Sequence, residues 1–148
     1  MSPVIRRSSL LVNTDLITAL RRLVSDMTTD TAVRVDVSAE GAVYPLSPDV
    51  AEGLLRIGQE ALTNALKHAG ATQIRVALTY RPREAELRVE DNGRGFDPLM
   101  VPMSDCLGLR GMQQRMQRLG GTFLMESSHN AGTQVKATVP ITTSVSEK

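Results

Sequence analysis

Hydrophobic and polar positions change their spacing several times along the first half of the chain. Apolar residues recur three or four positions apart between Leu16 and Met27, the spacing of one helix face, and Thr14 can cap that helix. Between Val33 and Ser38 they alternate with polar residues, which predicts a half-buried strand. A second helix is expected from Ser47 to Gly70, because a hydroxyl followed by proline and an acid is a strong helix start.

The same two spacings return in the second half. Residues 73–80 alternate, and the alternation resumes after a short connection and ends at Asp91, which predicts a hairpin. Residues 97–107 show no periodicity, and a loop of that length inside a compact domain is usually functional. A third helix is expected after Gly108, with Met112 and Met116 as core residues and Gly120-Gly121 as its stop.

Two further strands are expected around residues 123–125 and 135–139, joined by a turn that contains His129. The predicted order is therefore helix, strand, helix, two strands, long loop, helix, two strands. Alternating strands need one covered face, and amphipathic helices can supply the cover. We expect an α+β fold, a two-layer sandwich with the helices on one face of the sheet.

Composition narrows the class of protein. At 148 residues the chain can bury one core, and a hydrophobic content of 41% with 22% charged residues is ordinary for a globular domain. The net charge of +1 and the absence of Trp give no basic field and no stacking platform, so no nucleic-acid partner is expected.

The single Cys106 cannot form an internal disulfide and fits a reducing compartment. No apolar run reaches the length of about 18 residues that a membrane span needs, and the N-terminus lacks a signal-peptide pattern. We therefore expect a cytoplasmic domain without direct membrane contact. A place within a larger, membrane-attached sensor stays open.

The second predicted helix carries the first group of candidate residues. Glu60, Asn64, Lys67 and His68 fall within one stripe about 100° wide, beside a different, apolar side. Asn64 can offer Mg²⁺ a side-chain oxygen, and Lys67 can meet a phosphate as a point charge. His68 fits either a phosphate or loop contact or a satisfied helix-end residue. The simpler alternative is the solvated face of an ordinary amphipathic helix.

The second group follows the predicted hairpin. Asp91 ends a strand, and Gly93 and Gly95 follow it a residue apart, so backbone can approach the edge of a planar ligand there. The carboxylate can accept a hydrogen bond from an exocyclic amine such as adenine N6. The alternative is a simple turn, because Asn-Gly is a common turn dipeptide.

The third group, Gly108-Leu109-Arg110-Gly111, lies at a predicted helix start, where exposed N–H groups and the helix dipole favour phosphate. It is neither a Walker loop nor a Rossmann fingerprint, since the required endings and flanking elements are absent. The alternative is a loop hinge without a ligand. Neither histidine has a partner at zinc-ligand spacing, so we expect no zinc site.

Together these motifs resemble the ATPase domains of sensor histidine kinases. The run Glu60-x-x-x-Asn64-Ala65-Leu66-Lys67-His68 resembles their N box, and Asp91-x-Gly93-x-Gly95-Phe96 their first glycine box. Gly108 to Met112 resembles the second glycine box, and Gly132-Thr133 the terminal Gly-Thr. The four motifs occur in the family's order over about residues 15–140. Within the family, the run QEALTN and the run GLRGM most resemble the nitrate-sensor and DesK-like kinases.

This resemblance implies a Bergerat-type ATP-binding fold with a mixed, largely antiparallel sheet. It implies that Asp91 meets adenine N6, that Asn64 binds Mg²⁺ and that Thr133 supports the adenine end. Residues 97–107 would form the ATP lid. It also implies a set of phosphate neighbours: Lys67, Gly108, Leu109, Arg110 and Gly111. Glu60 matches the acid that polarises the attacking group in related ATPases, which makes it the catalytic candidate.

The chain departs from the kinase pattern in two ways. It lacks the phenylalanine-bearing lid box of the larger kinase families. Neither His68 nor His129 is followed by an acid on a dimerisation helix, so the phosphoacceptor histidine is expected on a separate domain. We expect residues 1–12 to be a linker from a dimerisation domain, residues 13–141 the ATP-binding domain and residues 142–148 a disordered tail.

The function implied by the resemblance is transfer of the ATP γ-phosphoryl group to a histidine on the dimerisation domain, and then to a response regulator. The cofactors would be ATP and Mg²⁺. A second hypothesis is a stand-alone serine kinase and regulatory module of the anti-sigma-factor class, favoured by the missing dimerisation hairpin. A third is a non-enzymatic, nucleotide-regulated interaction module, which loss of the motif residues would favour.

Overall fold

A computed structural model describes residues 15–67, 70–94, 109–127 and 130–141 of the chain. Several sequence predictions lie outside these described residues: the Thr14 cap, the lid at 97–107, the turn at His129 and the tail after 141. His68, Gly95 and Gly108 also lie outside them.

The order of elements agrees with the predicted order throughout the described residues. The helices are α2 (Asp15–Met27), α3 (Pro48–Lys67) and α4 (Leu109–Arg118). The strands are β1 (Arg34–Glu40), β2 (Gln73–Tyr80), β3 (Glu84–Asp91), β4 (Thr122–Ser127) and β5 (Thr133–Pro140). β1 continues past Ser38 because all seven of its residues, through Glu40, pair with β2.

The start of α3 shows the capping that its sequence predicts. The Ser47 hydroxyl accepts a hydrogen bond from the Val50 N–H at 3.3 Å, and the Ser47 carbonyl accepts one from the Ala51 N–H at 2.9 Å. Pro48 opens the helix, and Asp49 stands in its first turn near the positive end of the dipole. The helix is therefore fixed at the end that lies far from the candidate residues.

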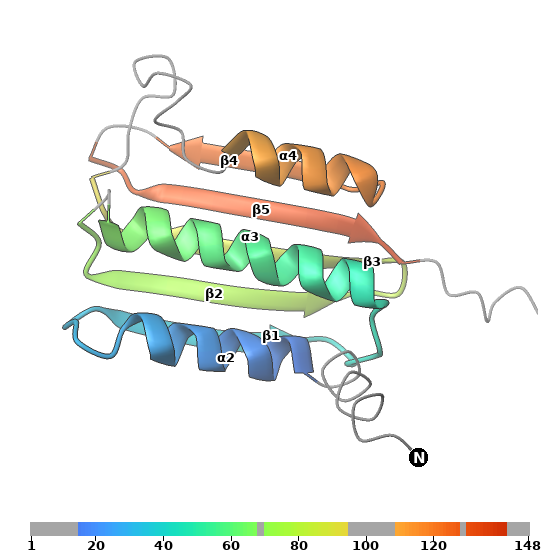
Figure 1. The fold of residues 1–148 in the computed structure, drawn as a ribbon, viewed down its shortest axis with the longest axis horizontal. Coiled ribbons are helices and arrows are strands. Elements are labelled where there is room, and N and C mark those ends of the chain that lie inside the picture. Colours follow the sequence, from blue (N-terminus) through green and yellow to red (C-terminus); the bar gives the residue numbers. More distant parts are fainter. Residues whose placement is uncertain (1–14, 68–69, 95–108, 128–129, 142–148) are drawn as a thin grey trace, which may run out of the picture.

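The five strands form one mixed sheet in the order β1-β2-β3-β5-β4. Only β1 and β2 pair in parallel, and the other three pairs are antiparallel. Figure 1 shows α2, α3 and α4 side by side on one face of this sheet. The two-layer α+β sandwich with a largely antiparallel sheet is confirmed.

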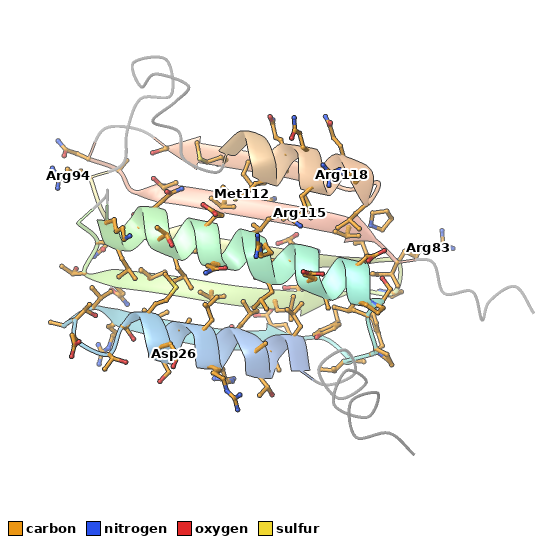
Figure 2. All side chains as sticks on the ribbon, viewed as in Figure 1. Asp26, Arg83, Arg94, Met112, Arg115 and Arg118 are labelled. Carbon is orange, nitrogen blue, oxygen red and sulfur yellow. The ribbon has the colours of Figure 1, made fainter. Side chains whose placement is uncertain are left out.

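The core fills the space between the helices and the sheet. From the helices, the fully buried side chains include Leu20, Leu54, Ile57 and Leu62. The sheet contributes alternate residues of its central strands: Ile74, Val76, Leu78, Leu87 and Val139. Met112 and Met116 of α4 are buried, which confirms them as core residues (Figure 2 labels Met112). Of the helices that the structure describes, none has both the length and the apolar character that crossing a membrane requires.

The opposite face of the sheet is polar and carries one buried acid. Glu86 is only 5% exposed, although its position in the alternation puts it on the polar face. Arg81 Nη1 lies 3.0 Å from Glu86 Oε1, and Arg88 Nη2 lies 3.1 Å from Glu86 Oε2. Burial alone would raise the pKa of Glu86, but the hydrogen bonds and charges of the two arginines lower it below its ordinary value.

Candidate functional site

The candidate residues gather at one end of the sandwich. In Figure 1 the C-terminal end of α3, the end of β3 and the start of β5 lie at the left side, and α4 begins nearer the middle, with its start toward that side. This follows from the antiparallel pairing, because β3 ends with Asp91 directly opposite Thr133, the first residue of β5. Motifs more than sixty residues apart in the chain therefore meet at one edge of the fold.

The helix α3 separates its two sides as the sequence predicts. Its packing side is buried, and this side includes Leu54, Gly58, Ala61, Leu62 and Ala65. Glu60 and Asn64 are half-buried and Lys67 is exposed, so the polar stripe borders the core. Lys67 is also the last residue of the helix, where a cation is favoured by the helix dipole. A carboxylate, a carboxamide and an amine are thus available along one helix.

Asp91 is held in a half-buried position at the end of β3. Its Oδ1 accepts a hydrogen bond from the Gly93 N–H at 2.7 Å, and the Thr133 N–H also donates to the carboxylate. Burial raises the pKa of Asp91 above its ordinary value, and the two N–H groups offset only part of this effect. A carboxylate has about four lone-pair sites, so a ligand N–H can still be accepted.

The close approach of β5 to Asp91 depends on Gly132. Gly132 has a φ of +78°, in the left-handed region, and a Cβ added there would lie 2.2 Å from the Asp91 carbonyl oxygen. Any side chain would push the two backbones apart and move the Thr133 N–H away from the carboxylate. The terminal Gly-Thr pair therefore sets the surroundings of Asp91.

A residue that the sequence analysis did not select, Ser127, completes this corner. Its Oγ lies 2.8 Å from Thr133 Oγ1, and it also donates to the Gly132 carbonyl at 3.4 Å. Ser127 is the last residue of β4 and pairs with Thr133 across the sheet. No local sequence signal marks it, because the contact exists only through the β4–β5 register.

A hollow of about 430 Å³ opens at these strand ends. Among the described residues its walls come from β3, β4, β5 and the turn before β5, and none comes from α3: Glu90, Asp91, Glu126, Ser127, Ala131, Gly132, Thr133 and Gln134. Because these residues lie on both faces of the sheet, the hollow extends around the strand ends beside Asp91.

The start of α4 offers open space. The helix begins at Leu109, as the phosphate-cradle interpretation requires, with Arg110 in its first turn. Gly111 is exposed, and among the described residues a Cβ added there would meet no atom within 4 Å. The packing of the chain itself therefore does not require a glycine at this position.

The described residues contain no cluster of acidic side chains that would indicate a metal site. Within the described ranges there is no group of three or more His, Cys, Asp or Glu side chains that could hold a metal ion. On α3, the candidate metal ligands are the side-chain oxygens of Asn64 and Glu60.

Comparison with known proteins gives a consistent family. Residues 49–143 match the family described as histidine kinase-, DNA gyrase B- and HSP90-like ATPases. The sensor histidine kinase MctS of Rhizobium johnstonii is 36% identical over 90% of this chain and 29% of its own length. The histidine-protein kinase/phosphatase DegS of Brevibacillus brevis is 32% identical over 86% of this chain and 33% of its own length. The chain thus spans about a third of the curated relatives that it matches.

A solved structure has the same architecture. The histidine kinase domain of the blue-light activated histidine kinase from Erythrobacter litoralis is 27% identical and superposes with a TM-score of 0.63. The match covers 84% of this chain and 60% of that chain.

Proposed function

The chain belongs to the family of histidine kinase-, DNA gyrase B- and HSP90-like ATPases, and it is the ATP-binding catalytic domain of a sensor histidine kinase. On this basis, we propose which residues bind ATP and Mg²⁺ and which assist phosphoryl transfer. The end of the sheet at Asp91 binds adenine. The end of α3 and the start of α4 bind the phosphates and Mg²⁺. The acceptor is a histidine on a separate dimerisation domain.

The adenine half rests on Asp91. Its carboxylate accepts from the exocyclic amine N6, which adenine has and guanine lacks at the same position. Two backbone N–H groups, from Gly93 and Thr133, fix the carboxylate before the ligand arrives. The Thr133 hydroxyl, bonded to Ser127, supports the same end of the base. Pre-positioned polar groups of this kind give selectivity, because a ligand that cannot pair with them leaves them unsatisfied.

The phosphate half rests on α3 and α4. Asn64 contributes a neutral oxygen to Mg²⁺, which commonly keeps few protein ligands and several waters. Lys67 adds a positive charge, and Gly108, Leu109, Arg110 and Gly111 surround the phosphates. The open space at Gly111 supports this arrangement, since a helix start without a side chain lets an anion approach its N–H groups.

Bound ATP supplies the γ-phosphoryl group, and the chain supplies position and charge neutralisation. Glu60, half-buried on the same stripe as Asn64, is placed to polarise the acceptor imidazole. His68, next to Lys67, contacts the phosphates or the loop above them. From the acceptor histidine the group passes to an aspartate of a response regulator.

The observation that carries this proposal is the half-buried Asp91 carboxylate, held by two N–H groups at the end of the sheet where α3 also ends. The experiment is a titration of the parent chain and of Asp91→Asn with ATP and with GTP. We expect the parent to prefer ATP, and the Asn variant to lose affinity for ATP at least several-fold, because a buried partner is lost. Asn64→Ala, titrated with and without Mg²⁺, is expected to lose the metal dependence. Equal affinity of the parent for ATP and GTP would remove Asp91 from the adenine role.

A further inference from the structure

The segment that follows α3 leads into β2, and the side chain of Asn92 adds hydrogen bonds between this segment and the end of β3. Asn92 Oδ1 accepts hydrogen bonds from the backbone N–H groups of Thr72 and Gln73, both at 3.0 Å. Its Nδ2 donates to Thr72 Oγ1 at 3.0 Å. The Asn92 N–H donates in turn to the Gln73 carbonyl at 3.2 Å. An exposed turn residue therefore makes three side-chain bonds and one backbone bond to one short segment.

That segment is connected directly to the last turn of α3. The Ala71 N–H donates to the Ala65 carbonyl at 3.3 Å, across Gly70, which has a φ of +63°. Ala71 itself is buried, with 5% of its surface exposed. Residues 71–73 therefore link the two parts: Ala71 is bonded to Ala65 of α3, and Thr72 and Gln73 are bonded to Asn92. This connection adds to the packing of the buried α3 residues.

A second contact joins the same two parts. A Cβ built on Gly70 would lie 3.3 Å from an Nη of Arg94, so the guanidinium lies beside this glycine, which follows α3 in the chain. Figure 2 shows Arg94 at the same end of the molecule as the C-terminus of α3. Arg94 is exposed and its stem is long, whereas the Asn92 amide is short and bonded at three points. Of these two side chains, Asn92 therefore makes the more closely defined link between the end of β3 and the segment that follows α3.

We propose that Asn92 is a positioning residue that holds the phosphate- and metal-binding end of α3 in place against the adenine-binding end of β3. This inference rests on the proposed function and deepens it. Asp91 remains held in the sheet by β2 and β5, so adenine binding does not need the Asn92 side chain. Asn64 and Lys67 need it, because their helix end is connected to the sheet edge through residues 71–73.

The test compares adenosine, which uses only the adenine half of the site, with Mg·ATP, which uses the adenine and phosphate halves. Adenosine and Mg·ATP are titrated against the full 148-residue chain and three variants: Asn92→Ala, Asn92→Asp and Thr72→Val. Asn92→Ala is expected to lower the affinity for Mg·ATP roughly tenfold, as loss of ordered hydrogen bonds does, and to change that for adenosine less than about twofold. Thr72→Val removes only the Nδ2 bond and should give a smaller loss, again for Mg·ATP alone.

Asn92→Asp is the rescue variant. One carboxylate oxygen can still accept from the two backbone N–H groups, and the other can accept from the Thr72 hydroxyl. Its affinity for Mg·ATP at neutral pH is expected to be close to that of the parent. A role in folding alone would instead lower the affinity for adenosine and for Mg·ATP by the same factor, and thermal unfolding of each variant measures that contribution.

Equal losses for the two ligands, or no loss in Asn92→Ala, would overturn the proposal. If Asn92→Ala does not fold, Thr72→Val decides: an unchanged ratio of the two affinities overturns it. Failure of the wider function looks different. A parent chain that binds no Mg·ATP, or whose affinity does not change in Asp91→Asn, contradicts the proposed function. A parent that binds, together with a normal effect of Asp91→Asn and an unchanged ratio in the Asn92 and Thr72 variants, contradicts the positioning role only.

Discussion

Asp91 is a half-buried carboxyl at the end of β3. Burial raises the pKa of the carboxyl above its ordinary value of 3.8, while the N–H groups of Gly93 and Thr133 lower it in part. The net pKa is raised, so a proton competes with the ligand at a higher pH than it would for an exposed aspartate. Adenine N6 is a donor, and the ionised carboxylate is a stronger acceptor for it than the protonated carboxyl.

The affinity of the chain for ATP should depend on pH through Asp91. The affinity for ATP is expected to be highest above the raised pKa of Asp91 and to fall as the pH drops through it, because protonation removes the charge and weakens the carboxyl as an acceptor for N6. ATP titrates in the same range, so the Asp91→Asn chain serves as the control. Calorimetric titrations at several pH values should show a pH-dependent loss in the parent beyond that of the variant. Parallel curves for the two proteins would contradict it.

A second prediction concerns Glu86 on the open face of the sheet. Because its pKa is lowered in the folded state, the stability it contributes is present above its unfolded pKa and is lost as the pH falls through the folded value. Glu86→Gln leaves two arginines without their shared acid. It should lower the free energy of unfolding at neutral pH by about 1–3 kcal/mol, with a smaller difference from the parent in acid. Urea denaturation at both pH values measures this.

The matched control for Glu86 is Glu84, one position along the same face. Its carboxylate lies 3.5 Å from Arg81 Nη1, but 44% of its side chain is exposed. A solvated pair of this kind contributes about 0–1 kcal/mol, so Glu84→Gln should have little effect. Similar losses in the two variants would show that burial is not the reason for the stability of the cluster.

At the scale of elements, α4 contains a glycine, Gly111, that makes the helix less stable than alanine would. Gly111 lies in the first turn, is exposed and has free space around its Cα. Alanine there should raise the free energy of unfolding by about 0.5–1 kcal/mol. If the free space admits phosphate, the same methyl group should weaken ATP binding several-fold. Thermal unfolding and ATP titration of Gly111→Ala measure both effects, and a more stable chain with unchanged ATP affinity would separate Gly111 from the phosphates.

The elements themselves were largely predictable, because each carries a clear local signal. The Ser47-Pro48-Asp49 start, the two alternating runs before Asp91 and the Met112–Met116 spacing all correspond to elements of the structure. What the sequence could not give is pairing between distant strands. The order β1-β2-β3-β5-β4, and with it the contact of Ser127 with Thr133, depends on the register of β5 against two partners.

Asn92 shows the same limit within the site. The sequence marks it as part of a turn dipeptide, and nothing local indicates that its amide meets Thr72, twenty residues earlier. Likewise, the alternating pattern of β3 predicts that Glu86 is exposed, yet two arginines from the same hairpin bind it and it is buried. Local pattern predicted which residues face the core and which end a strand. Side-chain partners across the sheet became visible only once the strands were assembled.

At the scale of the whole molecule, we propose that this chain binds Mg·ATP and transfers the γ-phosphoryl group to a histidine outside it. The most direct measurement is radiolabelling from γ-labelled ATP, with the 148-residue chain alone and with an added dimerisation hairpin of a kinase of the same subfamily. The two histidines of the chain lack the acidic neighbour of a phosphoacceptor, so the chain alone should gain little acid-labile label. The hairpin should become labelled at its histidine, and Glu60→Gln should reduce this labelling more than it reduces ATP binding. Strong phosphohistidine on the chain alone would contradict the account, as would acid-stable phosphoserine on the added partner.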